Sequence, residues 1–133
     1  MPDHTQNPIP TSGPMTRPKS VTQAAKLLHE HAHPAPNTQR ITFHTNELTS
    51  VCPMTGQPDF GTLTITYTPN ERILESKSLK FYVWSLREQP AFCEALAASI
   101  ADDITNAIQP ANLRVTVTQN TRGGLALEAT AER

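Results

Sequence analysis

Long apolar runs are absent from this sequence. No stretch approaches the roughly 18 consecutive apolar residues that a membrane-spanning helix needs. The segment Met1–Ser20 also lacks the apolar core of a secretory signal. These absences predict a protein of the cytoplasm that makes no contact with a membrane.

A large excess of charge of one sign is absent too. Eleven basic and twelve acidic residues leave a net charge of -1. Domains that bind nucleic acid usually carry a basic patch or stripe. We therefore expect no direct contact with nucleic acid, and small molecules are the favoured ligands.

Cysteine is scarce, with Cys52 and Cys93 as the two thiols of the chain. In a reducing cytosol two cysteines are expected to be free, and one of them can be reactive. Composition alone does not say which one.

The chain of 133 residues fits one folded domain. Seven of the twelve prolines lie in residues 1–39, among many Thr, Ser, Asn and His residues. Such a segment buries too little apolar surface to offset its conformational entropy. We therefore predict a Pro-rich, largely flexible N-terminal extension over 1–39 and a folded domain over 40–133. A short helix capped by Ser20 is expected at 20–29, where it could pack against a partner subunit.

The folded part alternates two kinds of pattern. Apolar residues at every second position predict four strands, at 41–44, 62–68, 112–118 and 124–129. Apolar residues at four-residue spacing predict a helix over 90–108, bounded by Pro90 and Pro110. A further helical turn is expected around 76–84, and the breaker-rich segment 46–60 is expected to be a loop.

This order of elements predicts the α+β class, with an antiparallel sheet and helices on one of its faces. A sheet of about four strands has two edges that can pair with a neighbouring subunit. A homo-oligomer is therefore favoured over a monomer.

The loop candidate for chemistry holds Cys52 and, seven residues later, Asp59. A thiol and a carboxyl group in one polar loop can serve as nucleophile and proton donor. The alternative is a buried structural cysteine, with Asp59 capping a turn. The spacing does not decide between the two.

A second candidate is the segment that contains Ser76, Lys77, Ser78 and Lys80. Positive charge beside hydroxyl donors suits a phosphate-bearing ligand. The alternative is a solvated surface with an internal Glu–Lys pair. No Gly-x-Gly-x-x-Gly motif occurs, so any dinucleotide must bind without a Rossmann crevice.

Two shorter candidates follow. Glu94, directly after Cys93, could accept two N–H groups from a guanine-like edge, or could act only as a favourable charge in the first turn of a helix. Arg122 and Gly123 form a basic turn that could hold a phosphate or could be an ordinary hairpin loop.

In their order and in their residues, these segments resemble the QueF nitrile reductase family, the NADPH-dependent 7-cyano-7-deazaguanine (preQ0) reductases of the short, unimodular type. The resemblance covers roughly residues 40–128. The matching segments are Thr-Ser-x-Cys-Pro-x-Thr-Gly-Gln-Pro-Asp-Phe at 49–60, Glu-Ser-Lys-Ser-Leu-Lys-x-Tyr at 75–82, Ser-x-Arg at 85–87, Phe-x-Glu at 92–94 and Arg-Gly-Gly at 122–124.

The resemblance implies a tunnelling fold, in which the sheets of several subunits form a barrel with active sites at the subunit interfaces. It assigns Cys52 as the nucleophile and Asp59 as the proton donor. The residues implied for the substrate preQ0 are Leu74, Glu75, Ser76, Cys93 and Glu94. Those implied for the cofactor NADPH are Lys77, Ser78, Lys80, Arg122 and Gly123.

The implied reaction suits these residue types. A nitrile is a poor hydride acceptor, but addition of the Cys52 thiolate converts it into a thioimide that can be protonated and reduced. Two hydride transfers from NADPH then give the aminomethyl product, preQ1, on the route to queuosine in tRNA. No metal or flavin is required.

One position departs from the family pattern. Where the family has Phe-His-Glu, this sequence has Cys93 between Phe92 and Glu94. If Cys93 lines the same pocket as Cys52, oxidation could link the two thiols, provided that their Cα atoms lie roughly 4.4–6.8 Å apart. Otherwise Cys93 packs in the core as a small apolar residue.

Two other functions remain open on the same residues. A relative of the family could use the cysteine adduct to make an amidine instead of an amine, but Lys77 and Lys80 argue against a branch that needs no NADPH. A noncatalytic purine- or pterin-binding protein is the other alternative. Cys52 with Asp59 argues against it, because a binding module has no use for a nucleophile.

Overall fold

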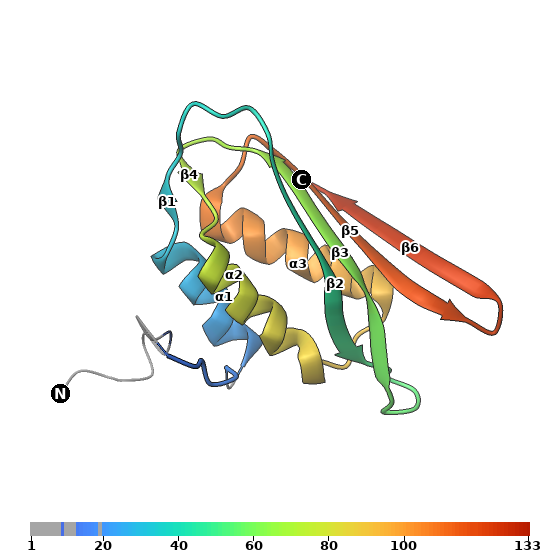
Figure 1. Cartoon of the computed structure of the whole chain (residues 1–133). Helices are drawn as coiled ribbons and strands as arrows, with labels where there is room; N and C mark the ends of the chain where they lie inside the picture. Colours follow the sequence, from blue (N-terminus) through green and yellow to red (C-terminus); the bar gives the residue numbers. More distant parts are fainter. Residues whose placement is uncertain (1–8, 10–12, 19) are drawn as a thin grey trace.

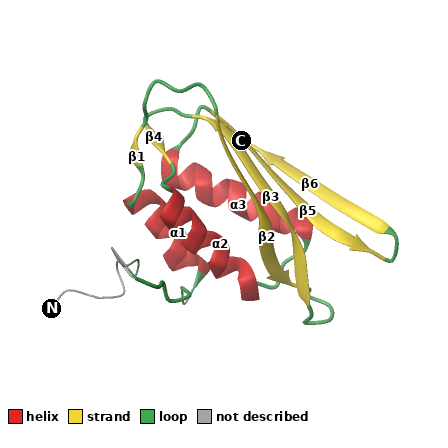
Figure 2. Cartoon of the chain, in the orientation of Figure 1, coloured by secondary structure: helices red, strands yellow, loops and turns green. Residues whose placement is uncertain are grey.

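The computed structural model describes residues 9, 13–18 and 20–133. They form two layers, a four-stranded antiparallel sheet and a layer of helices on one of its faces (Figures 1 and 2). The strands, in their order across the sheet, are β2 (Ile41–Val51), β3 (Pro58–Thr68), β5 (Asn112–Arg122) and β6 (Leu125–Glu132). The helices are α1 (Val21–Glu30), α2 (Ser76–Ser85) and α3 (Cys93–Ile108). The α+β architecture expected from the sequence is confirmed.

Smaller elements complete the chain. Strands β1 (His33–Pro34) and β4 (Arg72–Ile73) form a short antiparallel sheet, and the 3-10 turn η1 (Leu86–Glu88) follows α2. Helix α3 packs on β5 and β6, whereas α2 has few contacts with β2. This uneven coverage leaves space between α2 and the β2 side of the sheet.

The alternation in the strands sorts their side chains between the two faces. Leu63, Ile65 and Tyr67 of β3 are buried under the helices, with Val115 and Val117 of β5 beside them. The opposite face carries hydroxyl groups that meet in pairs across neighbouring strands. These pairs are Thr42 with Thr66 (3.3 Å) and Thr116 with Thr130 (3.2 Å).

The apolar stripe of the predicted long helix is buried as expected, through Leu96, Ile100, Ile104 and Ile108. The helix starts at Cys93 rather than at Pro90, because the residues before it pair with the end of β2: Ala91 N–H donates to the Val51 carbonyl (3.2 Å). It ends at Gln109, which adopts the left-handed conformation (φ 46°) before Pro110.

One expectation about local structure was wrong, and another underestimated a helix. Most of the predicted loop at 46–60 is strand, and the turn is confined to residues 52–57. The register of β2 against β3 shifts between Thr45 and Leu48, so a bulge absorbs the irregular residues while pairing continues to Val51 opposite Pro58. The expected helical turn at 76–84 is a full helix, because the Glu75 carboxylate caps its start.

Helix α1 belongs to the core. The Ser20 hydroxyl accepts from the Gln23 N–H (3.1 Å), and Ala24, Leu27 and Leu28 are buried. They pack toward α2 and α3 of the same chain, rather than toward a partner subunit as the sequence had allowed. The flexible extension was expected over 1–39; its residues 1–8, 10–12 and 19 lie outside the described residues, whereas α1 and β1 are ordered elements within it.

One hydrogen bond joins two helices under the sheet. The fully buried Tyr82 of α2 donates to Asp103 of α3 (2.5 Å), and burial raises the pKa of Asp103. Tyr82→Phe removes this donor from a half-buried carboxyl group, so we expect the free energy of unfolding to fall by about 1–3 kcal/mol in urea titrations. An unchanged urea midpoint would show that the bond contributes no net stability.

Candidate active site

Cys52 opens the turn between β2 and β3. Its N–H donates to the Gln57 carbonyl (2.9 Å), and the Gly56 N–H donates back to the Cys52 carbonyl (2.9 Å). Hydrogen bonds from the Thr55 hydroxyl, the Thr55 backbone and the Met54 backbone lower the pKa of the Cys52 thiol, against smaller opposing effects of burial and of Asp59. A free, partly exposed thiol with a lowered pKa is the form in which cysteine acts as a nucleophile.

Asp59 is the second residue of β3 and lies opposite Ser50 of β2. Arg122 Nη2 lies 2.6 Å from Asp59 Oδ1, and the same nitrogen donates a hydrogen bond to the Pro58 carbonyl (2.8 Å). Oδ1 is buried and has no hydrogen-bond partner in the described chain, so its contact with Arg122 is an ion pair without hydrogen-bond geometry. This oxygen is therefore paired with Arg122 by charge but retains unused hydrogen-bonding capacity.

Cys93, the first residue of α3, lies behind Asp59. Its Sγ donates to the Val117 carbonyl (3.3 Å), and burial, followed by the charge of Glu94, raises the pKa of this thiol. Cys93 and Asp59 line one cavity of about 20 Å³. Cys93 is thus a buried residue that also borders the site, and both cysteines are free thiols.

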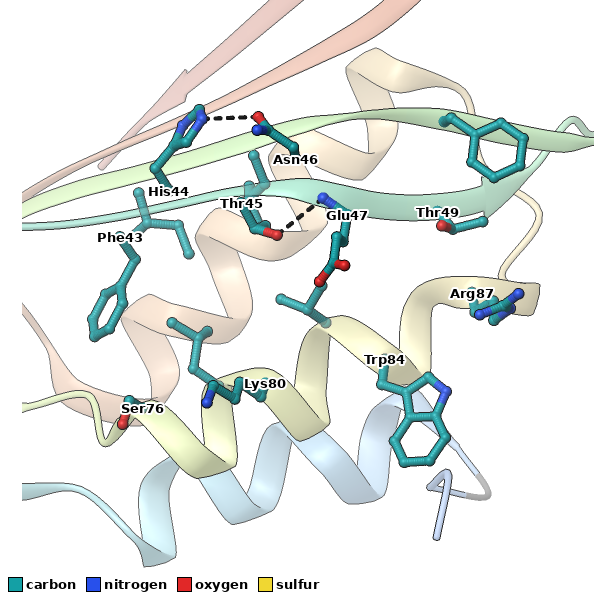
Figure 3. A pocket seen from close by; sticks show the side chains of 15 residues that line it. Phe43, His44, Thr45, Asn46, Glu47, Thr49, Ser76, Lys80, Trp84 and Arg87 are labelled. Carbon is teal, nitrogen blue, oxygen red and sulfur yellow. Dashed lines mark hydrogen bonds between the residues drawn. The ribbon is translucent and has the colours of Figure 1, made fainter. Parts of the chain in front are cut away.

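A much larger groove, with a volume of about 740 Å³, lies between α2 and the β2 side of the sheet (Figure 3). Its apolar lining comes from Phe43, Phe60, Leu63, Ile65, Leu79 and Val83. Lys80, Trp84, Arg87 and Glu47 lie along it in Figure 3. Phe60 lines both this groove and the small cavity of Asp59, so the two spaces are neighbours.

Sequence reasoning found Ser76 and Lys80 in this groove but missed Glu47, Trp84 and Arg87 as site residues. A usable signal was present for the last two. Positions 76, 80, 84 and 87 follow helical spacing, which places them on one side of α2 and its 3-10 extension. Glu47 carried no such signal, because it lies beside the bulge of β2, where the strand alternation is interrupted.

The start of α2 has an internal structural role. The Glu75 carboxylate accepts from the N–H groups of Lys77 and Ser78. Ser78 is fully buried and its hydroxyl donates to the Glu75 carbonyl (3.0 Å). The buried Leu74 donates its N–H to the Tyr67 hydroxyl (3.0 Å). Within a single chain, Leu74 and Ser78 therefore face the protein rather than a ligand.

The implied site residues form two separate groups. Cys52, Asp59, Cys93 and Arg122 gather at one end of the sheet, and Glu94 lies exposed in the first turn of α3 beside them. Gly123 forms the adjoining turn between β5 and β6, with a positive φ of 56°.

The second group, Glu75 to Lys80, lies at the far end of α2. The N–H of Val51, the neighbour of Cys52, donates to the carbonyl of Gln89, which lies beyond the C-terminal end of that helix. Ten residues of helix, about 15 Å, therefore lie between Ser76 and that end.

No helix among the described residues is long and apolar enough to cross a membrane. They also contain no group of three or more His, Cys, Asp or Glu side chains placed to hold a metal ion.

Comparison with known proteins gives one consistent result. The family model described as "QueF-like protein" matches residues 58–133. The NADPH-dependent 7-cyano-7-deazaguanine reductase of Thermomicrobium roseum is 43% identical over 111 residues, which cover 83% of this chain and 87% of the relative. The enzyme of the same name from Alkalilimnicola ehrlichii is 42% identical over 112 residues, covering 84% and 87% of the two chains.

A solved structure extends the comparison to the fold. The crystal structure of the archaeosine synthase QueF-Like in its apo form is 26% identical, with a TM-score of 0.68, over 73% of this chain and 95% of that one. The sequence matches and the shared fold agree, and the chain belongs to the QueF-like protein family.

Proposed function

We propose that this chain is a nitrile reductase that converts 7-cyano-7-deazaguanine (preQ0) into 7-aminomethyl-7-deazaguanine (preQ1), with NADPH as the reductant, in queuosine biosynthesis. The observation that carries the proposal is the Cys52 thiol, whose lowered pKa and partial exposure suit a nucleophile within reach of the charge of Asp59. The names of the curated relatives supply the substrate and the reductant.

In this proposal Cys52 Sγ forms a bond to the nitrile carbon and Asp59 delivers a proton to the nitrile nitrogen, giving a thioimide. Bound NADPH supplies the hydrides. Glu94, exposed beside Cys93, accepts N–H groups of the deazaguanine ring. The carboxyl group and the thiol need a covered pocket around the nitrile, because water competes with both.

The cavity at Asp59 measures about 20 Å³, which is far too small for a bicyclic base. A pocket for the substrate therefore needs further walls. Glu75 and Ser76 lie at the other end of α2, so they reach the same substrate only from a second copy of the chain. We accordingly propose a homo-oligomer with active sites at its interfaces.

The sheet has suitable surfaces for such assembly. Strands β2 and β6 are its two open edges. Leu125 and Leu127 of the β5–β6 hairpin, which extends beyond the helices in Figure 1, are 77% and 40% exposed. Open edges and exposed apolar residues favour continuation of the sheet into a neighbouring chain.

The groove along α2 fits NADPH in size and in charge. Its volume of about 740 Å³ lies within the roughly 300–1,000 Å³ of ligand pockets. Lys80 and Arg87 provide positive charge for phosphate groups, and Trp84 provides an aromatic surface. We propose that these residues, with Lys77, hold the cofactor, and that the buried Ser78 supports the start of the helix instead.

Substitutions in this groove should affect the cofactor selectively. For Lys80→Ala and Arg87→Ala we expect the KM for NADPH to rise by about tenfold, since each removes a charged partner of phosphate worth roughly 1.5 kcal/mol. The KM for preQ0 should change little. Lys26→Ala, on α1 and outside the groove, is the matched control. Equal rises in both KM values would contradict a cofactor role.

The groove also bears on the amidine-forming alternative. Retention of Lys80 and Arg87 beside a groove large enough for a dinucleotide favours a reductase. The archaeosine synthase is a more distant relative, at 26% identity, than the reductases at 43% and 42%. The noncatalytic alternative is disfavoured by the lowered pKa of Cys52.

The direct test incubates the full chain with preQ0 and NADPH and follows the nicotinamide absorbance. We expect oxidation of two NADPH for each preQ1 formed, and none without preQ0. Covalent labelling of Cys52 by preQ0, without NADPH oxidation and with ammonia consumed, would instead indicate the amidine-forming reaction. Failure of preQ0 to label Cys52 would exclude both reactions. We further propose that the enzyme acts in the cytoplasm.

A further inference from the structure

The ion pair between Arg122 and Asp59 joins the end of β5 to the start of β3. The guanidinium is 46% exposed, whereas the carboxyl group is 12% exposed and keeps one buried oxygen without a hydrogen-bond partner. The resemblance to the family implied that Arg122 contacts NADPH. Arg122 is, however, not among the residues that line the groove along α2.

The guanidinium group, 2.6 Å from Asp59 Oδ1, holds the carboxyl group in place by charge attraction. In the proposed reaction Asp59 first accepts a proton and then donates it. The Cys52 thiol is the available source: the negative charge of Asp59 acts on it and opposes the lowering of its pKa. A thiol that loses its proton to Asp59 becomes the nucleophile that the reaction needs.

We propose that Arg122 is a positioning residue that holds the Asp59 carboxyl group at the small cavity, where Asp59 carries the Cys52 proton to the nitrile nitrogen. This inference rests on the proposed function. The proton leaves Cys52 Sγ for the Asp59 carboxylate, and Sγ forms a bond to the nitrile carbon. One π bond of the nitrile breaks, and its nitrogen takes the proton from Asp59. Asp59 is then again a carboxylate paired with Arg122.

The surroundings of Asp59 make Arg122 the relevant cation. Cys93 approaches from α3 and lines the same cavity, and the charge of Glu94 acts on this thiol. Cys52 approaches from the turn after β2. Among the described residues, Arg122 forms an ion pair with Asp59. Its removal leaves a mostly buried carboxylate without a counter-charge.

The test measures formation of the Cys52 adduct with preQ0 in the absence of NADPH, by mass spectrometry over times long enough to resolve slow variants. For Arg122→Met we expect adduct formation to slow by about tenfold or more, since proton transfer by a positioned side chain contributes roughly 10²–10⁴-fold. Arg122→Lys should recover part of the rate. The KM for NADPH should stay unchanged, in contrast to Lys80→Ala.

A double-mutant cycle separates this role from a general structural one. In an Asp59→Asn background, Arg122→Met should cause no further slowing, because the group that Arg122 acts through is gone. An additive slowing, or a raised KM for NADPH with normal adduct formation, would overturn the inference. If the wild-type chain forms no adduct and oxidises no NADPH, the proposed function itself fails. If it does both and Arg122→Met equals it, this inference alone fails.

Discussion

Cys52→Ala should abolish both turnover and the covalent adduct with preQ0. The lowered pKa of Cys52 arises from the Thr55 hydroxyl and the backbone of the same turn, so the structure prepares this thiol for nucleophilic attack. Without a nucleophile the nitrile stays unactivated toward hydride. We expect a loss of about 10³-fold or more in kcat, measured by NADPH absorbance, and no mass increase on incubation with preQ0.

Two variants sharpen this prediction. Cys52→Ser keeps a small polar side chain and should bind preQ0, detected by calorimetry, without reducing it. Cys93→Ala serves as the matched control, because Cys93 is the other free thiol and donates to the Val117 carbonyl inside the protein. It should still form the adduct on Cys52. Adduct formation in Cys52→Ala, or its loss in Cys93→Ala alone, would move the nucleophile to Cys93.

Gly61→Ala should have the largest effect on stability. A Cβ atom at this position would lie 2.2 Å from the carbonyl oxygen of Thr118 on β5, a backbone atom that cannot turn aside. The strands must therefore separate locally, and we expect the free energy of unfolding to fall by about 3 kcal/mol or more in urea titrations. Because Gly61 also lines the cavity of Asp59, adduct formation should slow as well.

Thr62→Ala, on the neighbouring residue of the same strand, is the control for that measurement. It leaves the backbone approach of β3 to β5 unchanged and should lower stability by well under half as much. A Gly61→Ala variant with the wild-type urea midpoint would show that the two strands can move apart at little energetic cost.

The element order was predictable from the sequence because the chain alternates cleanly where it pairs. Leu63, Ile65 and Tyr67 mark β3, and the four-residue spacing up to Ile108 marks α3. The segment 46–60 was not predictable, because Gly56 and Pro58 are residue types that favour a loop. The pairing of β2 with β3 continues to Val51 opposite Pro58, so both strands extend into this segment.

The candidate site was likewise predictable only in part. Cys52 and Asp59 were found because they lie close together in one motif, and the structure keeps them at one end of the sheet. The role of Arg122 was not predictable. Its contact with Asp59 depends on β5 lying beside β3, and a charge near a glycine turn suggests a phosphate as readily as a carboxylate. Trp84 and Arg87 were missed although they follow Ser76 and Lys80 at helical spacing.

The threonine pairs on the outer face of the sheet bear on whether a newly synthesised chain aggregates. Threonine has the branched Cβ that strands favour, yet its hydroxyl can be hydrated or paired across strands, as between Thr116 and Thr130. This face therefore offers a newly synthesised chain no apolar strip on which to aggregate. The risk of amyloid-like pairing is confined to the strand edges and the hairpin tip, and those are the surfaces that a neighbouring subunit would cover.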